Sequence, residues 1–142
     1  MLIQEIVWYL VLADESDVGV ARRRARELAD KQGLLPNAVE ALATAVSEVA
    51  RNVIVHARRG ELLLGVVRDS HRAGVVAVAR DDGPGIPRLE DALRDGYSTG
   101  QGLGLGLPSA RRLVDEFEIH SEVGHGTTVT LKKWAPLRSR NP

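Results

Sequence analysis

The stretch "GYSTGQGLGLGLPSARRLVDEF", from Gly96 to Phe117, joins a glycine-rich segment to the pattern of an amphipathic helix. Five glycines fall between Gly96 and Gly106, and Pro108 stands where the first turn of a helix tolerates proline. The free N–H groups and the dipole at a helix N-terminus favour anions. The stretch therefore predicts either a phosphate-binding loop or, more plainly, a surface loop before a helix.

Two common phosphate-binding motifs do not fit this stretch. A Walker A loop needs Gly-Lys-Ser/Thr, and no lysine lies between Lys31 and Lys132. A dinucleotide-binding fingerprint follows a strand, and its third glycine would fall at Leu107. What remains is a loop that leads into the N-terminus of a helix.

The composition favours one globular domain. The chain has 142 residues, 44% of them hydrophobic, and no cysteine, which excludes disulfides, thiolate metal sites and a cysteine nucleophile. The 19 basic and 19 acidic residues lack the basic excess of a general nucleic-acid binder. The apolar run at the N-terminus is too short to span a bilayer, so we expect a soluble, cytoplasmic protein.

Hydrophobic periodicity predicts an α+β fold. The predicted strands are 3–12, 61–68, 73–80, 118–123 and 127–134. The first predicted helix runs from a cap at Asp14, Ser16 or Asp17 to about Gly33. The other predicted helices run from Pro36 to about Ala57, over 88–96 and over 107–117. Hairpin connections favour a two-layer sandwich, with helices packed on one face of a mixed, mostly antiparallel sheet. We expect one domain over 1–135 and a polar C-terminal tail over 136–142.

The second predicted helix carries two polar residues on one face. Its apolar face comprises Val39, Leu42, Ala43, Val46, Val49, Ala50 and Val53. Glu48 and Asn52 lie four residues apart and therefore stack, in a row whose other members, Ala41 and Ala45, are small. Such a face could hold a ligand or a metal. Alternatively, it is a solvated face on which Glu48 pairs with Arg51 or another nearby arginine.

Two glycine-containing turns adjoin predicted strands. Asp81, Gly83 and Gly85 form D-x-G-x-G directly after a strand. A carboxylate there can accept a hydrogen bond from an exocyclic amine while the glycines allow a close backbone approach, although the same residues also suit an ordinary turn. The sequence "GHGT", Gly124–Thr127, opens the last strand as a tight hairpin turn.

Four motifs in fixed order resemble the boxes of one superfamily. E-x-x-x-N on a helix, D-x-G-x-G after a strand, G-x-G-x-G before a helix and G-x-G-T before the last strand are similar to the N, G1, G2 and G3 boxes of the GHKL ATPases, over nearly the whole chain. The chain is too short for the multidomain members, and its four histidines lie in no phosphoacceptor context. The segments "SEVARN", "DDGPGIP" and "TTVTLKKW" look most like the RsbT-type switch kinases of the stressosome, which are related to the anti-sigma kinases RsbW and SpoIIAB.

The resemblance implies the Bergerat fold and a serine/threonine kinase that uses ATP and Mg²⁺. Asn52 would coordinate Mg²⁺, Glu48 would take the proton from the attacking hydroxyl, and Asp81 would accept from the adenine amino group. The other implied cofactor-binding residues are Gly83 and Gly85 beside the base, Gly102, Gly104 and Gly106 in a lid over the phosphates, and Thr127 near the adenine.

The resemblance also implies partners. A STAS-domain protein would be both the substrate and the sequestering scaffold, and the released kinase would activate a PP2C-type phosphatase or another regulator in bacterial stress signalling. Neither a nucleic acid nor a membrane is expected as a partner. The alternatives are an anti-sigma factor that acts by sequestration and, as a weaker one, a detached histidine-kinase catalytic domain.

Overall fold

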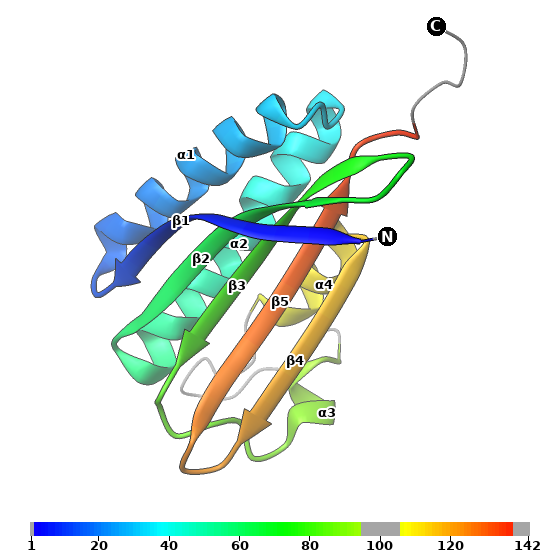
Figure 1. Cartoon of the computed structure of the whole chain (residues 1–142). Coiled ribbons are helices and arrows are strands. Elements are labelled where there is room, and N and C mark those ends of the chain that lie inside the picture. Colours follow the sequence, from blue (N-terminus) through cyan, green and yellow to red (C-terminus); the bar gives the residue numbers. More distant parts are fainter. Residues whose placement is uncertain (1, 95–105, 138–142) are drawn as a thin grey trace, which may run out of the picture.

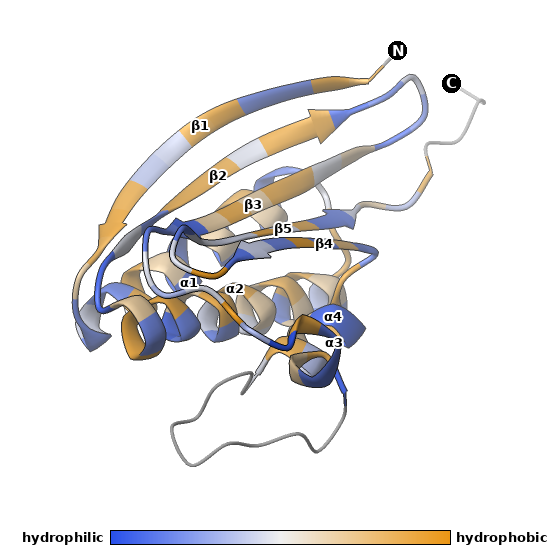
Figure 2. Ribbon diagram, turned by 90° about the horizontal axis from the view of Figure 1, so that it is seen from below, coloured by the Kyte–Doolittle hydropathy of each residue, from blue (hydrophilic) through white to orange (hydrophobic). Residues whose placement is uncertain are grey.

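The computed structural model describes residues 2–94 and 106–137, which form a sheet covered on one face by helices (Figure 1). The elements are β1 (Ile3–Leu12), α1 (Glu15–Lys31), α2 (Pro36–Ala57), β2 (Gly60–Arg68), β3 (Ala73–Asp81), α3 (Leu89–Ala92), α4 (Leu107–Leu113), β4 (Glu116–Glu122) and β5 (Gly126–Trp134). The strand order is β1-β2-β3-β5-β4, and each neighbouring pair is antiparallel. Figure 2 shows the sheet as one layer and the helices as the other, which confirms the α+β two-layer fold.

Helix α1 begins at a capping box, and of the three predicted caps Asp14 is the N-cap residue. The Asp14 carboxylate accepts a hydrogen bond of 2.8 Å from the backbone N–H of Ser16, and the Asp17 carboxylate accepts one of 3.0 Å from the backbone N–H of Asp14. These bonds satisfy N–H groups that have no partner within the helix. The buried residues of α1 are small, which lets the helix lie close to α2: Val18, Ala21, Ala25 and Ala29.

Helix α2 is the central helix of its layer and contacts both α1 and α4. All seven residues of its predicted apolar face are buried, and most of them join one core with inward-facing residues of the sheet such as Leu62 and Leu64. Ala45, in the row of Glu48 and Asn52, is also fully buried. The other three members, Ala41, Glu48 and Asn52, are partly exposed, so the row borders neighbouring elements and also reaches solvent.

The two helices that flank the glycine-rich stretch are shorter than the sequence predicts. Helix α3 ends at Ala92, and part of its predicted range lies outside the described residues. Helix α4 ends at Leu113, four residues before Phe117, because Val114 is extended and β4 begins at Glu116. Pairing with β5 satisfies the backbone groups of β4, and the ring of Phe117 is half-buried there.

The proposed domain boundary after residue 135 stays a prediction, and residues 138–142 of the expected tail lie outside the described part. Within the described ranges, no helix is both long enough and apolar enough to cross a membrane.

Truncating a core side chain of α2 tests this packing. Leu42 is fully buried, so Leu42→Ala should lower the free energy of unfolding by about 2–5 kcal/mol, through lost transfer energy and a cavity. Val55 lies on the same helix and is 52% exposed, so Val55→Ala should change that free energy by less than about 0.5 kcal/mol. Urea unfolding of both variants measures the difference, and equal losses would contradict the assigned core face.

Candidate nucleotide-binding site

A narrow cavity lies between α2, the end of β3 and the start of β5. Its polar lining residues are Asn52, His56, Asp81 and Thr127, and its one glycine is Gly85. The other lining residues are apolar and include Ile86 and Leu107. Of the four polar residues and the glycine, all except His56 are predicted by the sequence to bind the cofactor. The fold thus brings together residues from three of the four sequence motifs.

Asp81 is half-buried at the end of β3. Its Oδ1 accepts a hydrogen bond of 2.8 Å from the backbone N–H of Gly83. Burial raises the pKa of the Asp81 carboxyl above its ordinary value, while the backbone N–H groups of Gly83 and Thr127 and the nearby His56 offset part of that rise. Because a carboxylate offers about four lone-pair positions, Asp81 retains acceptor capacity for a ligand.

His56 is a member of the cavity that the sequence motifs did not single out. It lies one helical turn after Asn52, so the i, i+4 spacing was the available signal. Its Nε2 atom is buried and has no hydrogen-bond partner among the described residues. Burial lowers the pKa of His56, and the Asp81 carboxylate offsets part of that fall. An unpaired buried ring nitrogen costs free energy, which a ligand in the cavity could recover.

The loop after β3 is held against β4 and β5. Ser121 Oγ accepts a hydrogen bond of 2.7 Å from the backbone N–H of Ile86 and lies 2.8 Å from Thr127 Oγ1. Gly85 has φ +77°, and a Cβ there would lie 2.4 Å from the carbonyl oxygen of Glu122. Packing against β4 therefore already requires glycine at this position, whereas room for a nucleotide base stays a prediction. Antiparallel pairing of β4 with β5 places Ser121 opposite Thr127, a relation that no local motif reveals.

Glu48 does not line the cavity that contains Asn52. Its side chain is 29% exposed and borders a second hollow with Thr44, Ser109, Arg112 and Leu113. Gly106 precedes α4 with φ +82°, and a Cβ there would lie 2.1 Å from Glu48 Oε2. The backbone at the end of the glycine-rich stretch therefore packs directly against this carboxylate. Glu48 and Asn52 occupy consecutive turns of α2 but face different spaces.

The plainer expectation for Glu48, an ion pair with Arg51, is also met. Arg51 Nη1 lies 3.4 Å from Glu48 Oε1. Gly102 and Gly104 lie outside the described residues, so Gly106 is the only one of the three predicted lid glycines that the structure describes. Among the described side chains, no group of three or more His, Cys, Asp or Glu residues could hold a metal ion.

The buried His56 predicts a pH dependence of stability. Its pKa is lower in the folded protein than in the unfolded chain, so the unfolded chain binds more protons near and below pH 6.5. Acidification through this range therefore lowers the free energy of unfolding through His56, because the unfolded chain takes up the proton more readily than the folded protein does. We expect the free energy of unfolding of the wild type to fall, relative to that of His56→Gln, between about pH 7 and pH 5.

Urea unfolding at several pH values measures this difference. Both proteins keep Asp81, whose raised pKa increases the free energy of unfolding on acidification. His71, exposed in the turn between β2 and β3, provides the control, since His71→Gln should keep the wild-type decline. A constant difference between the wild type and His56→Gln across this range would contradict the prediction.

Comparisons with known proteins indicate the family of this chain. A family model described as the histidine kinase-like ATPase domain matches residues 11–133. The serine/threonine-protein kinase RsbT of Bacillus subtilis is 39% identical over 120 residues, which are 84% of this chain and 90% of that protein. The anti-sigma F factor of Geobacillus stearothermophilus is 37% identical over 98 residues, which are 63% of this chain and 65% of that protein.

A solved structure shares the fold. The mycobacterial sensor histidine kinase MprB superposes with a TM-score of 0.55 and 16% sequence identity, and the match covers 92% of this chain and 99% of that one. The matched family model contains α2, the end of β3 and β5, which together build the cavity. The chain therefore belongs to the histidine kinase-like ATPase family, as its four motifs predicted.

Proposed function

We propose that the protein is an ATP- and Mg²⁺-dependent serine/threonine protein kinase of the RsbT type, which phosphorylates STAS-domain partner proteins. The observation that carries this proposal is the placement of Glu48 and Asn52 on consecutive turns of α2, with Asn52 in a cavity beside Asp81 and Glu48 outside it. Nucleotide binding alone does not require a carboxylate at the edge of the site. The similarity to RsbT of Bacillus subtilis over most of both chains supports the same conclusion.

The cavity has the chemistry that adenine recognition needs. The half-buried Asp81 carboxylate would accept a hydrogen bond from the exocyclic amine, and Thr127 would contribute through water near the base. The apolar Ile86 and Leu107 would contact the base, for which the cavity of about 20 Å³ would have to widen. The remaining nucleotide contacts that we propose come from backbone groups at Gly83, Gly85, Gly102, Gly104 and Gly106.

The donor set fits Mg²⁺ held together with phosphate groups. Mg²⁺ prefers oxygen ligands and is usually bound through one or two protein groups plus substrate phosphates and water. The Asn52 carboxamide oxygen would supply such a ligand at the edge of the cavity.

Glu48 would act on the acceptor protein. When bound, MgATP supplies the phosphoryl group. Glu48 would take the proton of the serine or threonine hydroxyl, whose oxygen bonds to the γ-phosphorus as the bond from that phosphorus to the bridging oxygen breaks and ADP leaves. The hollow beside Thr44 and Ser109 gives an acceptor side chain access to Glu48 without passing through the cavity.

The proposed cellular role follows the RsbT type. A STAS-domain protein would bind and sequester the kinase until it is phosphorylated. The released kinase would then activate a PP2C-type phosphatase or another downstream regulator of a stress response in the cytoplasm. Similarity to the anti-sigma F factors supports an exchange of protein partners as the general mode of action.

An anti-sigma factor that acts by sequestration is the second candidate, and the anti-sigma F relatives favour it. Capture experiments with the full chain separate the two functions. Recovery of a sigma factor supports sequestration, whereas recovery of STAS-domain proteins that become phosphorylated supports the switch kinase.

Nucleotide affinity should depend on Asp81. Asp81→Asn keeps the shape but replaces an acceptor oxygen with a donor that faces the adenine amine, so affinity for ATP with Mg²⁺ should fall roughly ten- to a hundredfold. Asp82 is the exposed neighbour, so Asp82→Asn should bind as the wild type does. Calorimetric titration measures both, with circular dichroism as the check that the fold persists. Unchanged affinity in Asp81→Asn would remove this residue from the site.

Catalysis should depend on Glu48 separately from binding. Glu48→Gln removes the base but keeps a similar volume, so it should leave ATP affinity nearly intact and lower transfer by about 10²–10⁴-fold. Asn52→Ala should reduce Mg²⁺-dependent ATP binding as well as the rate. The measurement is radiolabel transfer from ATP to recombinant STAS-domain proteins of the same cell. Transfer by Glu48→Gln at the wild-type rate, or no transfer by the wild type to any of them, would contradict the kinase mechanism.

A further inference from the structure

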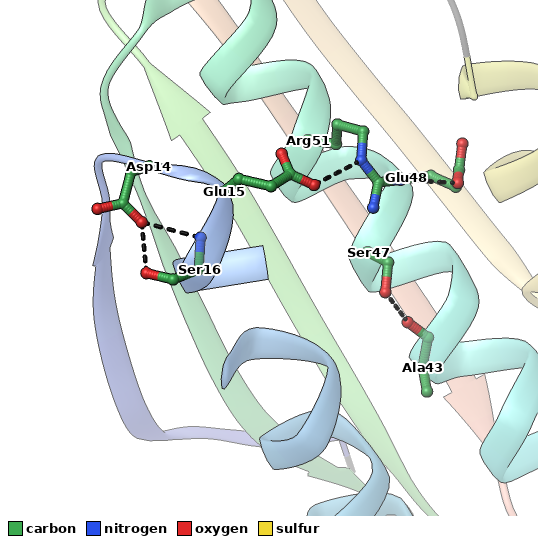
Figure 3. A network of polar contacts seen from close by, with 7 residues as sticks. All are labelled: Asp14, Glu15, Ser16, Ala43, Ser47, Glu48 and Arg51. Carbon is green, nitrogen blue, oxygen red and sulfur yellow. Dashed lines mark hydrogen bonds and ion pairs between the residues drawn. The ribbon is translucent and has the colours of Figure 1, made fainter. Parts of the chain in front are cut away.

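Arg51 connects Glu48 to the first turn of α1. Its Nη1 lies 3.4 Å from Glu48 Oε1, and its Nε lies 3.2 Å from Glu15 Oε1 (Figure 3). One planar guanidinium therefore contacts two carboxylates from different helices at the same time. We propose that Arg51 is a positioning residue that orients the Glu48 carboxylate for phosphoryl transfer, with Glu15 as its anchor; this rests on the proposed function of Glu48.

Each oxygen of the Glu48 carboxylate has a close neighbour. Arg51 Nη1 donates a hydrogen bond to Glu48 Oε1. The other oxygen, Oε2, lies next to the backbone of Gly106, so close that a Cβ at position 106 would clash with it. With these two neighbours the Glu48 side chain lies at the hollow beside Thr44 and Ser109. Rates of transfer are sensitive to the direction of such a side chain, since a displacement of about 1 Å can cost about a hundredfold.

Glu15 can serve as an anchor because its backbone is itself fixed. It is the first residue of α1, and the capping bonds of Asp14, Ser16 and Asp17 hold that turn. Figure 3 shows the Asp14–Ser16 bonds on one side of Glu15 and Arg51 on the other. The guanidinium therefore receives a restraint from α1 that a pair within α2 alone would lack.

Helix-to-helix stabilisation does not account for Arg51. The side chains of Arg51 and Glu15 are 45% and 68% exposed, and exposed ion pairs contribute little to stability. A second ion pair between α1 and α2, Arg26 with Glu40, has two short contacts of 2.8 Å and 2.9 Å and lies far along the helices from Glu48. What distinguishes Arg51 from Arg26 is its contact with Glu48.

Lysine cannot reproduce this arrangement in full. The Arg51 Nε and Nη1 atoms bond two carboxylates in a fixed geometry, whereas a lysine ammonium is a single point charge on a flexible stem. Arg51→Lys should therefore recover part of the rate that Arg51→Gln loses. A role through net charge alone would give full recovery.

The test compares Arg51→Gln with the matched control Arg26→Gln. The full-length variants transfer radiolabel from ATP to the recombinant STAS-domain protein that accepts most label from the wild type, and kcat and the KM for ATP are measured. We expect Arg51→Gln to lower kcat about ten- to a hundredfold with little change in KM, and Arg26→Gln to leave both near wild type. Glu15→Gln should lower kcat by a smaller factor in the same direction.

The decisive variants combine Arg51→Gln with Glu48→Gln. If Arg51 acts through Glu48, the double variant transfers no more slowly than Glu48→Gln alone. Additive losses, an unchanged or increased kcat in Arg51→Gln, or an equal loss in Arg26→Gln would each overturn the positioning role. Those outcomes leave the proposed function standing as long as Glu48→Gln alone is slow, whereas a fully active Glu48→Gln would overturn the proposed function itself.

Discussion

The burial of the apolar face of α2 against the sheet is the constraint on which the site depends. Residues such as Leu42, Val46 and Val49 are almost completely inaccessible, so the rotation of the helix about its axis is set by the core. Once that rotation is set, Glu48, Asn52 and His56 must follow each other at one-turn intervals along α2, and the last two lie beside the end of β3 and the start of β5. The chemistry of the site is therefore a consequence of how a hydrophobic stripe packs.

The second requirement is a wall opposite α2, and three separate segments build it. The end of β3 supplies Asp81, the loop after it supplies Gly85, and β5 supplies Thr127. Ser121 joins these segments, because it bonds both to the loop backbone at Ile86 and to the Thr127 hydroxyl. A polar bond at this point fixes the loop without adding bulk to the cavity.

The polar groups of the cavity lower the stability of the fold that holds them. Burial raises the pKa of Asp81 and lowers that of His56, so each group resists its charged form. The unpaired Nε2 atom of His56 adds to this cost. Sites that bind ligands commonly depart from optimal packing in this way, and here the large apolar core of α2 and the sheet offsets the cost.

The sequence by itself determined the element order, the apolar face of α2, the family and four of the five polar or glycine residues that line the cavity, because each of these depends on local periodicity or on spacing within one motif. It placed the end of α4 and the start of β4 wrongly, since pairing with β5 competes with helix formation there. The tertiary structure alone decided that His56 joins Asp81, that Ser121 meets Thr127, and that Arg51, whose pairing with Glu48 the sequence had offered, also reaches Glu15. Each of these three relations joins residues from different segments and depends on packing or on strand register, which no local pattern in the chain encodes.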